Sequence, residues 1–220
     1  VALGDVVAEV EKLLADYPAP DGVDLEVGGT VEDQGDAFGD LGTLLILIVI
    51  LVYIVMATQF ESLKFPFIIM FTIPFAFTGV FLALWMTSTP LSLIALIGAI
   101  MLVGIVTKNG IVMVDYMNLL IERGSGVFDA VIAGGKSRLR PVLMTSFTTI
   151  LGMLPLAIGT GAGSETWQPM GIAVIGGLTF STILTLFIVP VLYSILVNRS
   201  QRKEREKLAR LSAEHQASKH

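Results

Sequence analysis

Residues 41–60 read LGTLLILIVILVYIVMATQF, a run of twenty uncharged residues between Asp40 and Glu61. The hydrocarbon core of a bilayer is about 30 Å thick, and roughly 20 apolar residues of α-helix cross it. The run therefore predicts a membrane-spanning helix. The composition agrees, because 54% of the 220 residues are hydrophobic and 15% are charged, whereas soluble domains carry about 25% charged residues.

The later uncharged runs predict four more spans. Forty-three uncharged residues lie between Lys64 and Lys108, too many for one crossing, and they divide at the turn-forming sequence TSTP at 87–90. A fourth span is expected to begin after Arg140. We therefore expect spans at about 41–60, 65–86, 91–120, 141–159 and 170–197. The predicted fold class is mainly α, an integral membrane helical bundle of five transmembrane helices whose transmembrane domain covers 41–198.

The lysines and arginines near the span ends predict the orientation, because positive residues are retained on the cytoplasmic side. Lys64 lies between the first two spans, and seven bases follow Asn198. Four more lie between the third and fourth spans: Arg123, Lys136, Arg138 and Arg140. All of these fall on one side of a five-span chain, and the other side has only Lys12. We expect a periplasmic N-terminal segment and a basic cytoplasmic tail at 199–220.

Residues 1–40 differ in composition from the rest of the chain. Residues 1–42 contain eleven acidic residues and one base, a charge of -10, whereas the whole chain carries -5. Apolar residues at helical spacing between Leu3 and Leu14 predict a helix, and alternation between Val23 and Val27 predicts a strand. Forty residues cannot close a core of their own. We interpret 1–40 as the end of a periplasmic α+β porter subdomain, and we expect the chain to be part of a longer protein.

Lys108 is the residue most informative about function. It lies within VTKNG at 106–110, with apolar sequence on both sides. A lysine inside a membrane helix costs at least about 2.5–3.5 kcal/mol on insertion scales and normally faces a bundle interior with a partner. The alternative is a lysine that snorkels to the interface. The one other intramembrane charge, Asp115, is seven positions away, about 10 Å along a helix. We therefore expect a carboxylate partner on a helix that this chain does not contain.

Two further charged residues lie near the same interior. Asp115 is close to the cytoplasmic end of its span, where a satisfied interfacial aspartate is the simpler interpretation. Arg140 fits an interfacial anchor. Arg138 differs, because it precedes Thr145 by seven residues and shares its helix face if the fourth helix extends that far.

Thr145, Thr148 and Thr149 form a polar stripe at helical spacing. Such threonines often bond only to their own backbone carbonyls. The functional interpretation is that the stripe points to the same interior as Lys108 and contributes to a hydrogen-bonded proton path.

Several classes of function are excluded or disfavoured. The chain has no cysteine, which excludes disulfides, thiolate metal sites and a cysteine nucleophile. Its two histidines, His215 and His220, lie in the last six residues. The near match to a Walker A loop at 130–137 and the glycine-rich stretch at 159–163 are both interpreted as loops without nucleotide chemistry. We expect no enzyme activity, cofactor, metal site or nucleic acid partner, and we expect membrane lipid around the spans.

With these motifs in place, the sequence resembles a known family, the resistance-nodulation-division (RND) efflux permeases, and in particular the multidrug branch that exports hydrophobic and amphiphilic compounds. The resemblance is carried by FES at 60–62, GIVTKNGIVMVDY at 104–116, RLRPVLMTS at 138–146 and GMLPLAIGTGAG at 152–163. Their order and spacing agree over about 20–200.

The resemblance implies an inner-membrane transporter that couples proton uptake to export, in which this chain supplies the last five spans. It implies that Lys108 pairs with two aspartates of another span. Thr145 and Arg138 match the family's relay threonine and arginine, and Asn109 is the neighbour of the lysine. We add Asp115 as a fifth candidate. The family further implies a homotrimer of the full-length protein, a periplasmic adaptor and an outer-membrane channel.

Two alternatives stay open. The metal-exporting branch is disfavoured, because no intramembrane methionine pair has the spacing of a metal relay, although the nine methionines keep the question open. An alternative from a different class is a non-transporting accessory half-subunit or scaffold that pairs with a second membrane polypeptide.

Overall fold

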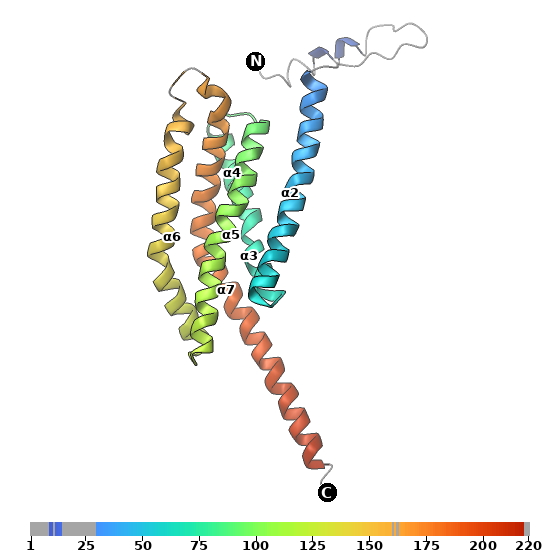
Figure 1. The fold of residues 1–220 in the computed structure, drawn as a ribbon, viewed down its shortest axis with the longest axis vertical. Helices are drawn as coiled ribbons and strands as arrows, with labels where there is room; N and C mark the ends of the chain where they lie inside the picture. Colours follow the sequence, from blue (N-terminus) through green and yellow to red (C-terminus); the bar gives the residue numbers. More distant parts are fainter. Residues whose placement is uncertain (1–8, 11, 15–29, 160, 162, 218–220) are drawn as a thin grey trace, which may run out of the picture.

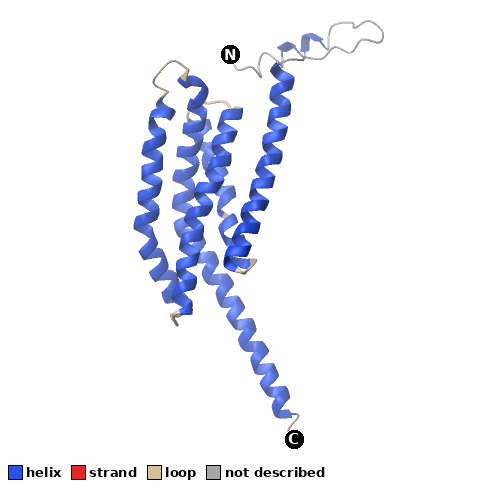
Figure 2. Cartoon of the chain, viewed as in Figure 1, coloured by secondary structure: helices blue, strands red, loops and turns tan. Residues whose placement is uncertain are grey.

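The computed structural model describes residues 9, 10, 12–14, 30–159, 161 and 163–217, of which residues 30–32 and 199–217 are described by their backbone alone. All regular structure in these residues is helical, and they contain no strand (Figures 1 and 2). The helices in order are α2 (Thr30–Phe60), α3 (Lys64–Met70), α4 (Thr72–Met86), α5 (Leu93–Glu122), α6 (Val127–Ile158) and α7 (Ser164–Ala217). The predicted helical membrane bundle is confirmed, and the strand predicted at 23–27 lies outside the described residues.

Five helical segments are long and apolar enough to cross a membrane, as expected. They are Asp33–Phe60, Lys64–Met86, Leu93–Glu122, Val127–Ile158 and Ser164–Asn198. Their bounds differ from the expected ones mainly where charged residues continue a helix beyond the hydrocarbon, because an uncharged run marks only the part of a helix that lies in the apolar core.

The largest difference is at α6, which begins at Val127 and not after Arg140. The helix is 32 residues long, about 48 Å at 1.5 Å per residue, and so exceeds the bilayer core. Pro141, which is typical of a helix start, lies inside it. The interpretation of 130–137 as a loop is therefore wrong, since these residues are helical. At the other end, Gly159 stops the helix with a left-handed φ of 70°.

The second expected span consists of two helices, α3 and α4, that meet at Phe71. Pro74 explains the break, because proline has no N–H to donate to the carbonyl four residues earlier, at Met70. The buried hydroxyl of Thr72 donates to the carbonyl of Ile69 at 2.6 Å and so satisfies one of the carbonyls at the end of α3.

The final helix, α7, runs from Ser164 to Ala217 without interruption, so the backbone beyond the expected end of the fifth span is also helical. It lies at the centre of the bundle, where it packs most extensively against α4, α5 and α6 (Figure 1).

Small residues bring α7 close to its neighbours. A Cβ at Gly176 would lie 2.1 Å from the Cβ of Ala83, and a Cβ at Gly177 would lie 2.2 Å from Leu102 Cδ2. Ala173, four residues before Gly177, is fully buried. The pair from Ala173 to Gly177 is thus a close-packing feature, as small residues at this spacing predict.

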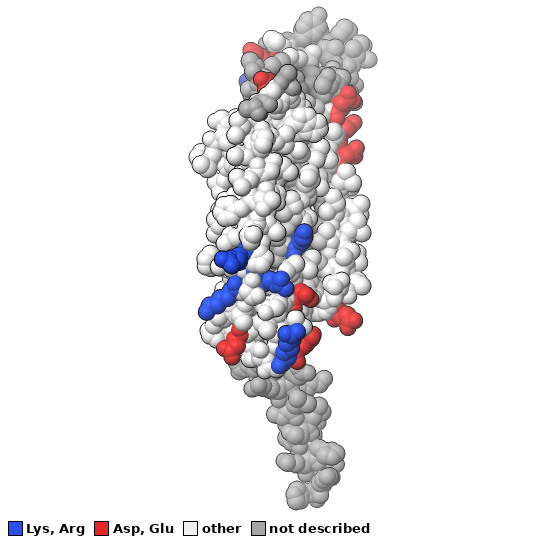
Figure 3. Space-filling view, turned by 60° about the vertical axis from the view of Figure 1, so that its left-hand side comes forward, with Lys and Arg blue, Asp and Glu red and all other residues white. Residues whose placement is uncertain are grey.

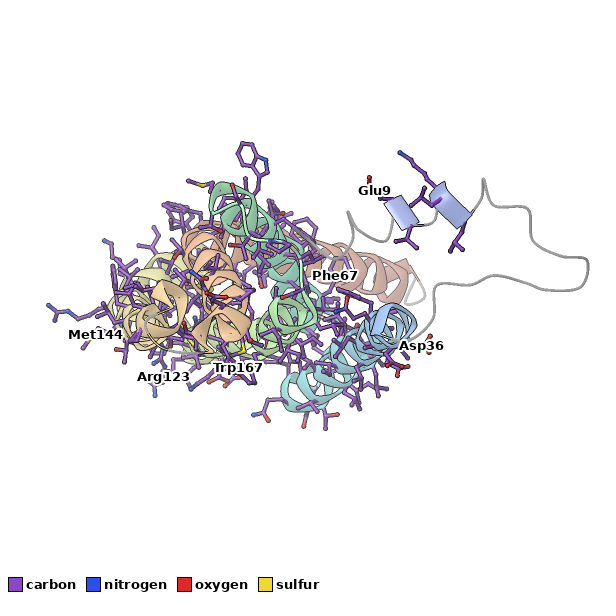
Figure 4. The ribbon with its side chains drawn as sticks, turned by 90° about the horizontal axis from the view of Figure 1, so that it is seen from above. Glu9, Asp36, Phe67, Arg123, Met144 and Trp167 are labelled. Atoms are coloured by element: carbon purple, nitrogen blue, oxygen red, sulfur yellow. The ribbon has the colours of Figure 1, made fainter. Side chains whose placement is uncertain are left out.

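In contrast, α2 stands at the edge of the bundle, and only 6% of its most apolar window is buried inside the described part of the chain. Its contacts are with α3 and α5, and in Figure 1 its upper end leans away from the other helices. The view from above in Figure 4 shows α2, which carries Asp36, at the margin of the helices.

Candidate functional site

Lys108 lies at the middle of α5, fifteen residues after Leu93 and fourteen before Glu122. At 1.5 Å per residue it is roughly 20 Å from either end of the helix. This depth argues against a lysine that snorkels to the interface. The side chain is exposed, in the sense that no described residue covers it, and no ion pair forms at its ammonium within the described part of the chain.

The exposed side of α5 is a continuous helical stripe. The opposite side packs into the core through residues such as Val106, Gly110 and Val114. The stripe, which we call the open face of α5, consists of Met101, Gly104, Lys108, Val112, Asp115 and Leu119. A lysine and an aspartate therefore share one face of a membrane helix that this chain leaves uncovered. Asn109 is half-buried at the edge of that face.

The helix α6 presents the threonine stripe. Thr145 and Thr148 are exposed and Thr149 is half-buried. Each donates to a carbonyl of its own helix: Thr145 to Val142 at 3.0 Å, Thr148 to Met144 at 2.8 Å and Thr149 to Thr145 at 2.9 Å. In this conformation the threonines therefore bond to backbone carbonyls of their own helix, as the simpler interpretation expects. Each hydroxyl oxygen can still accept a hydrogen bond.

Among the five predicted relay residues, Arg138 is the one for which the described structure shows a side-chain contact with another helix. Its guanidinium carbon lies 4.7 Å from the centre of the Tyr116 ring on α5. Arg138 is half-buried, and its Nε is buried without a hydrogen-bond partner in the described residues. The seven-residue spacing predicted that Arg138 and Thr145 share a helix if the fourth helix extends back to Arg138. Since α6 begins at Val127, the two residues do share a helix.

A buried group of hydroxyls between α6 and α7 was not found from the sequence. Ser146 Oγ and Thr182 Oγ1 are 2.9 Å apart, and both side chains are buried. Thr185 Oγ1, almost one turn further along α7, is buried without a partner in the described residues. The threonines and serine of α7 do repeat at helical spacing, but the sequence does not show which side of α7 meets α6.

A cavity of about 740 Å³ lies at the opposite end of the bundle from the basic residues, between α4, α6 and α7. Its walls include Met86, Leu154, Ile158 and Ile172, and Glu165 is the one charged residue that lines it. None of the five predicted relay residues lines this cavity. Within the described residues, no three histidine, aspartate or glutamate side chains gather as ligands for a metal ion.

Basic residues lie toward one end of the bundle, whereas acidic residues lie toward both ends (Figure 3). Asp33, Asp36 and Asp40 lie near the start of α2, whereas the lysines and arginines of α3, α5 and α6 gather in the lower half of the described bundle (Figure 3). Five candidate spans and an exposed lysine at mid-helix together describe a helical membrane protein with a charged residue inside one of its spans.

Comparison with known proteins identifies the class. Residues 1–197 match the AcrB/AcrD/AcrF family, and the chain therefore belongs to that family of RND permeases. Among its relatives are the swarming motility protein SwrC of Bacillus subtilis, which is 37% identical over 90% of this chain, and the cobalt-zinc-cadmium resistance protein CzcA of Cupriavidus metallidurans, 37% identical over 92%. The multidrug resistance protein MdtC of Erwinia tasmaniensis is 37% identical over 93%.

Solved structures agree with these relatives. Two crystal forms of a heavy metal efflux pump superimpose with TM-scores of 0.76 and 0.77 at 29% identity, each over 89% of this chain. The chain spans about a fifth of the length of the proteins that it matches, since the shares are 19% for SwrC and CzcA and 20% for MdtC. The relatives carry both drug and metal names, so the comparisons do not single out the multidrug branch.

Proposed function

We propose that this chain forms the lysine, threonine and arginine side of the proton path in a proton-driven RND efflux transporter. The observation that carries the proposal is Lys108, an ammonium at the middle of α5 on a face that no described residue covers. A cation at that depth is costly unless it is paired. The open face of α5 is therefore the surface on which a carboxylate-bearing helix of the complete transporter would pack.

The chemistry follows from the charge of the site. While the partner carboxylates are ionised, they attract the ammonium of Lys108. When they take up protons they lose their charge, and the attraction that holds the helices together weakens. Each protonation state then favours a different arrangement of the helices. In this scheme Asn109 flanks the pair, Thr145 supplies a hydroxyl that can accept or donate, and Arg138 and Asp115 mark the path toward the cytoplasmic side.

We propose an inner-membrane location, with the N-terminal segment periplasmic and the C-terminal tail cytoplasmic. The bases of the lower half support this orientation, because positive residues are retained inside. Trp85 and Trp167 are 79% and 49% exposed at the other end, where α4 ends and α7 begins, as expected of an interfacial aromatic belt. Labelling with a membrane-impermeant maleimide tests this orientation. Ser88→Cys should react from outside, and Arg123→Cys should react only after permeabilisation.

The substrate proposed here is an amphiphile, as in the multidrug branch, exported by a homotrimer with a periplasmic adaptor and an outer-membrane channel. Residues 1–40 would be the end of a porter subdomain, 41–198 the membrane domain and 199–220 the tail. The relatives named for metals favour a second candidate, a divalent metal ion as substrate. Ethidium and Zn²⁺ separate the two candidates: cells that express the complete gene at its own locus should export ethidium and gain no Zn²⁺ resistance.

The relay residues are tested by substitution in the complete gene. Lys108→Ala and Thr145→Ala should abolish export while leaving the amount of protein in the membrane and its oligomeric state unchanged. Lys136→Ala is the matched control, because Lys136 is an exposed lysine on α6, and it should export like the wild type. Export that survives Lys108→Ala would refute the proposal and would favour the accessory or scaffold function.

A further inference from the structure

The contact between Arg138 and Tyr116 differs from the usual setting of a basic residue at a membrane interface. Its neighbours Lys136 and Arg140 are exposed, as anchors normally are. Arg138 instead turns between α5 and α6, is half-buried, and places its guanidinium carbon 4.7 Å from the centre of the Tyr116 ring. That distance is within the range of a cation–π interaction, which is strongest where water is excluded.

The partner of this guanidinium is an aromatic ring and not an acid. No ion pair forms at Arg138 within the described residues, and its Nε is buried without a hydrogen-bond partner there. Arginine commonly pairs with a carboxylate through two parallel hydrogen bonds. A ring attracts the cation through its face, accepts no proton and leaves the N–H donors unoccupied. The guanidinium is therefore held beside the ring without a carboxylate to occupy its N–H donors.

The position of Tyr116 connects this contact to the open face of α5. Asp115 and Tyr116 are consecutive, and consecutive residues of an α-helix point about 100° apart. Asp115 therefore lies on the open face while Tyr116 meets α6. Any displacement of α5 that moves Lys108 and Asp115 also moves the ring that holds Arg138.

We propose that Tyr116 is a positioning residue of the proton path, whose ring holds the guanidinium of Arg138 in the first half of α6 and makes its placement follow the movement of α5. The inference rests on the proposed function, since it assumes that Arg138 acts in the path. It assigns a role to a residue that carries no charge and that is not among the five predicted relay residues.

The first test measures the placement of Arg138 and needs no substrate. Phenylglyoxal modifies accessible arginines, and the modification of Arg138 in the complete, membrane-embedded protein is followed by mass spectrometry. The variants are Tyr116→Leu and Tyr116→Met, which remove the ring, and Tyr116→Phe, which keeps it. Loss of the ring should raise the rate of Arg138 modification about five- to thirtyfold, the factor that corresponds to a partly desolvated cation–π contact. Tyr116→Phe should stay within about twofold of the wild type.

The second test measures transport with ethidium or Zn²⁺, whichever the wild type exports. Tyr116→Leu should lower the maximal rate about five- to thirtyfold and leave the KM unchanged, and Tyr116→Phe should restore it. Arg138→Ala combined with Tyr116→Leu should be no slower than Arg138→Ala alone, because both remove the same contact. Tyr53→Leu is the matched control, a half-buried tyrosine on α2 whose hydroxyl donates to the carbonyl of Leu63.

The outcomes separate the two proposals. If Lys108→Ala abolishes export but Tyr116→Leu and Tyr116→Met leave both Arg138 modification and the maximal rate unchanged, the positioning role is wrong and the proposed function stands. If the maximal rate of Tyr116→Phe falls as far as that of Tyr116→Leu, the hydroxyl group and not the ring is required, and the inference is overturned. If export survives Lys108→Ala, the proposed function fails first, and the modification rate still decides whether the ring holds Arg138.

Discussion

Gly176 is the position at which one added methyl group should disturb the bundle most. In Gly176→Ala the new Cβ would lie 2.1 Å from the Cβ of Ala83 and 2.9 Å from the carbonyl oxygen of Gly79, both on α4. The Cβ of Ala83 is fixed to the backbone and cannot rotate away, so α4 and α7 must separate. Overpacking of this kind costs about 1–3 kcal/mol, and the better helix propensity of alanine returns about 0.5–1 kcal/mol.

The free energy of unfolding should therefore fall by about 1–2 kcal/mol in Gly176→Ala. Thermal unfolding of the purified protein in detergent, followed by circular dichroism, should show a Tm several degrees lower than that of the wild type. Gly39→Ala is the control, because nothing lies within 4 Å of a Cβ at that exposed position of α2, and its Tm should equal or exceed the wild-type value. Adding Ala83→Gly to Gly176→Ala removes the closest contact and should recover part of the loss.

The reasoning is refuted if Gly176→Ala melts at or above the wild-type temperature, or if Gly39→Ala melts as far below it as Gly176→Ala does. It is also refuted if the double substitution is no more stable than Gly176→Ala alone, because the steric cost would then lie elsewhere.

Three further predictions follow from the packing. Ser146→Ala leaves the buried hydroxyl of Thr182 without its partner and should lower the free energy of unfolding by about 1 kcal/mol. In the same melting assay, the Tm of the double variant Ser146→Ala with Thr182→Val should be closer to the wild-type value. Tyr193→Phe removes the hydrogen bond that Tyr193 donates to Asn118 Oδ1 and should also cost about 1 kcal/mol, measured by the same melts. The indole of Trp85, 79% exposed, should be quenched more strongly by lipids brominated near the headgroup than by lipids brominated at the chain ends; stronger quenching from the chain ends would contradict its interfacial position.

The number of spans could be predicted from the sequence because roughly 20 apolar residues of helix cross a bilayer, so the length of each uncharged run indicates how many crossings it contains. The helix ends could not be predicted in the same way. The fourth span was expected to begin after Arg140, where the uncharged run begins, yet α6 begins at Val127 and continues through Pro141. At Pro74 the same chemistry does end a helix, and α3 separates from α4.

Part of the candidate site was also accessible from the sequence. Lys108 stands out because a charge surrounded by apolar residues has few explanations, and the structure leaves it on an uncovered face as expected of a residue whose partner is not in the described chain. The contacts of Arg138 with Tyr116 and of Ser146 with Thr182 depend on how two helices are rotated against each other. Spacing along one helix shows which residues share a face but does not show which neighbour that face meets.

The central position of α7 has a consequence for how the protein is made. The three most extensive helix pairs of the described bundle all include α7, which follows its three partners α4, α5 and α6 in the chain. During synthesis, α4, α5 and α6 enter the bilayer before the surface that joins them exists. The surface of α4 around Gly79 and Ala83 must therefore be solvated by lipid until α7 arrives, as in two-stage assembly of membrane helices. These helices can pack together only after α7 has been translated, so α7 determines when this part of the protein acquires its tertiary structure.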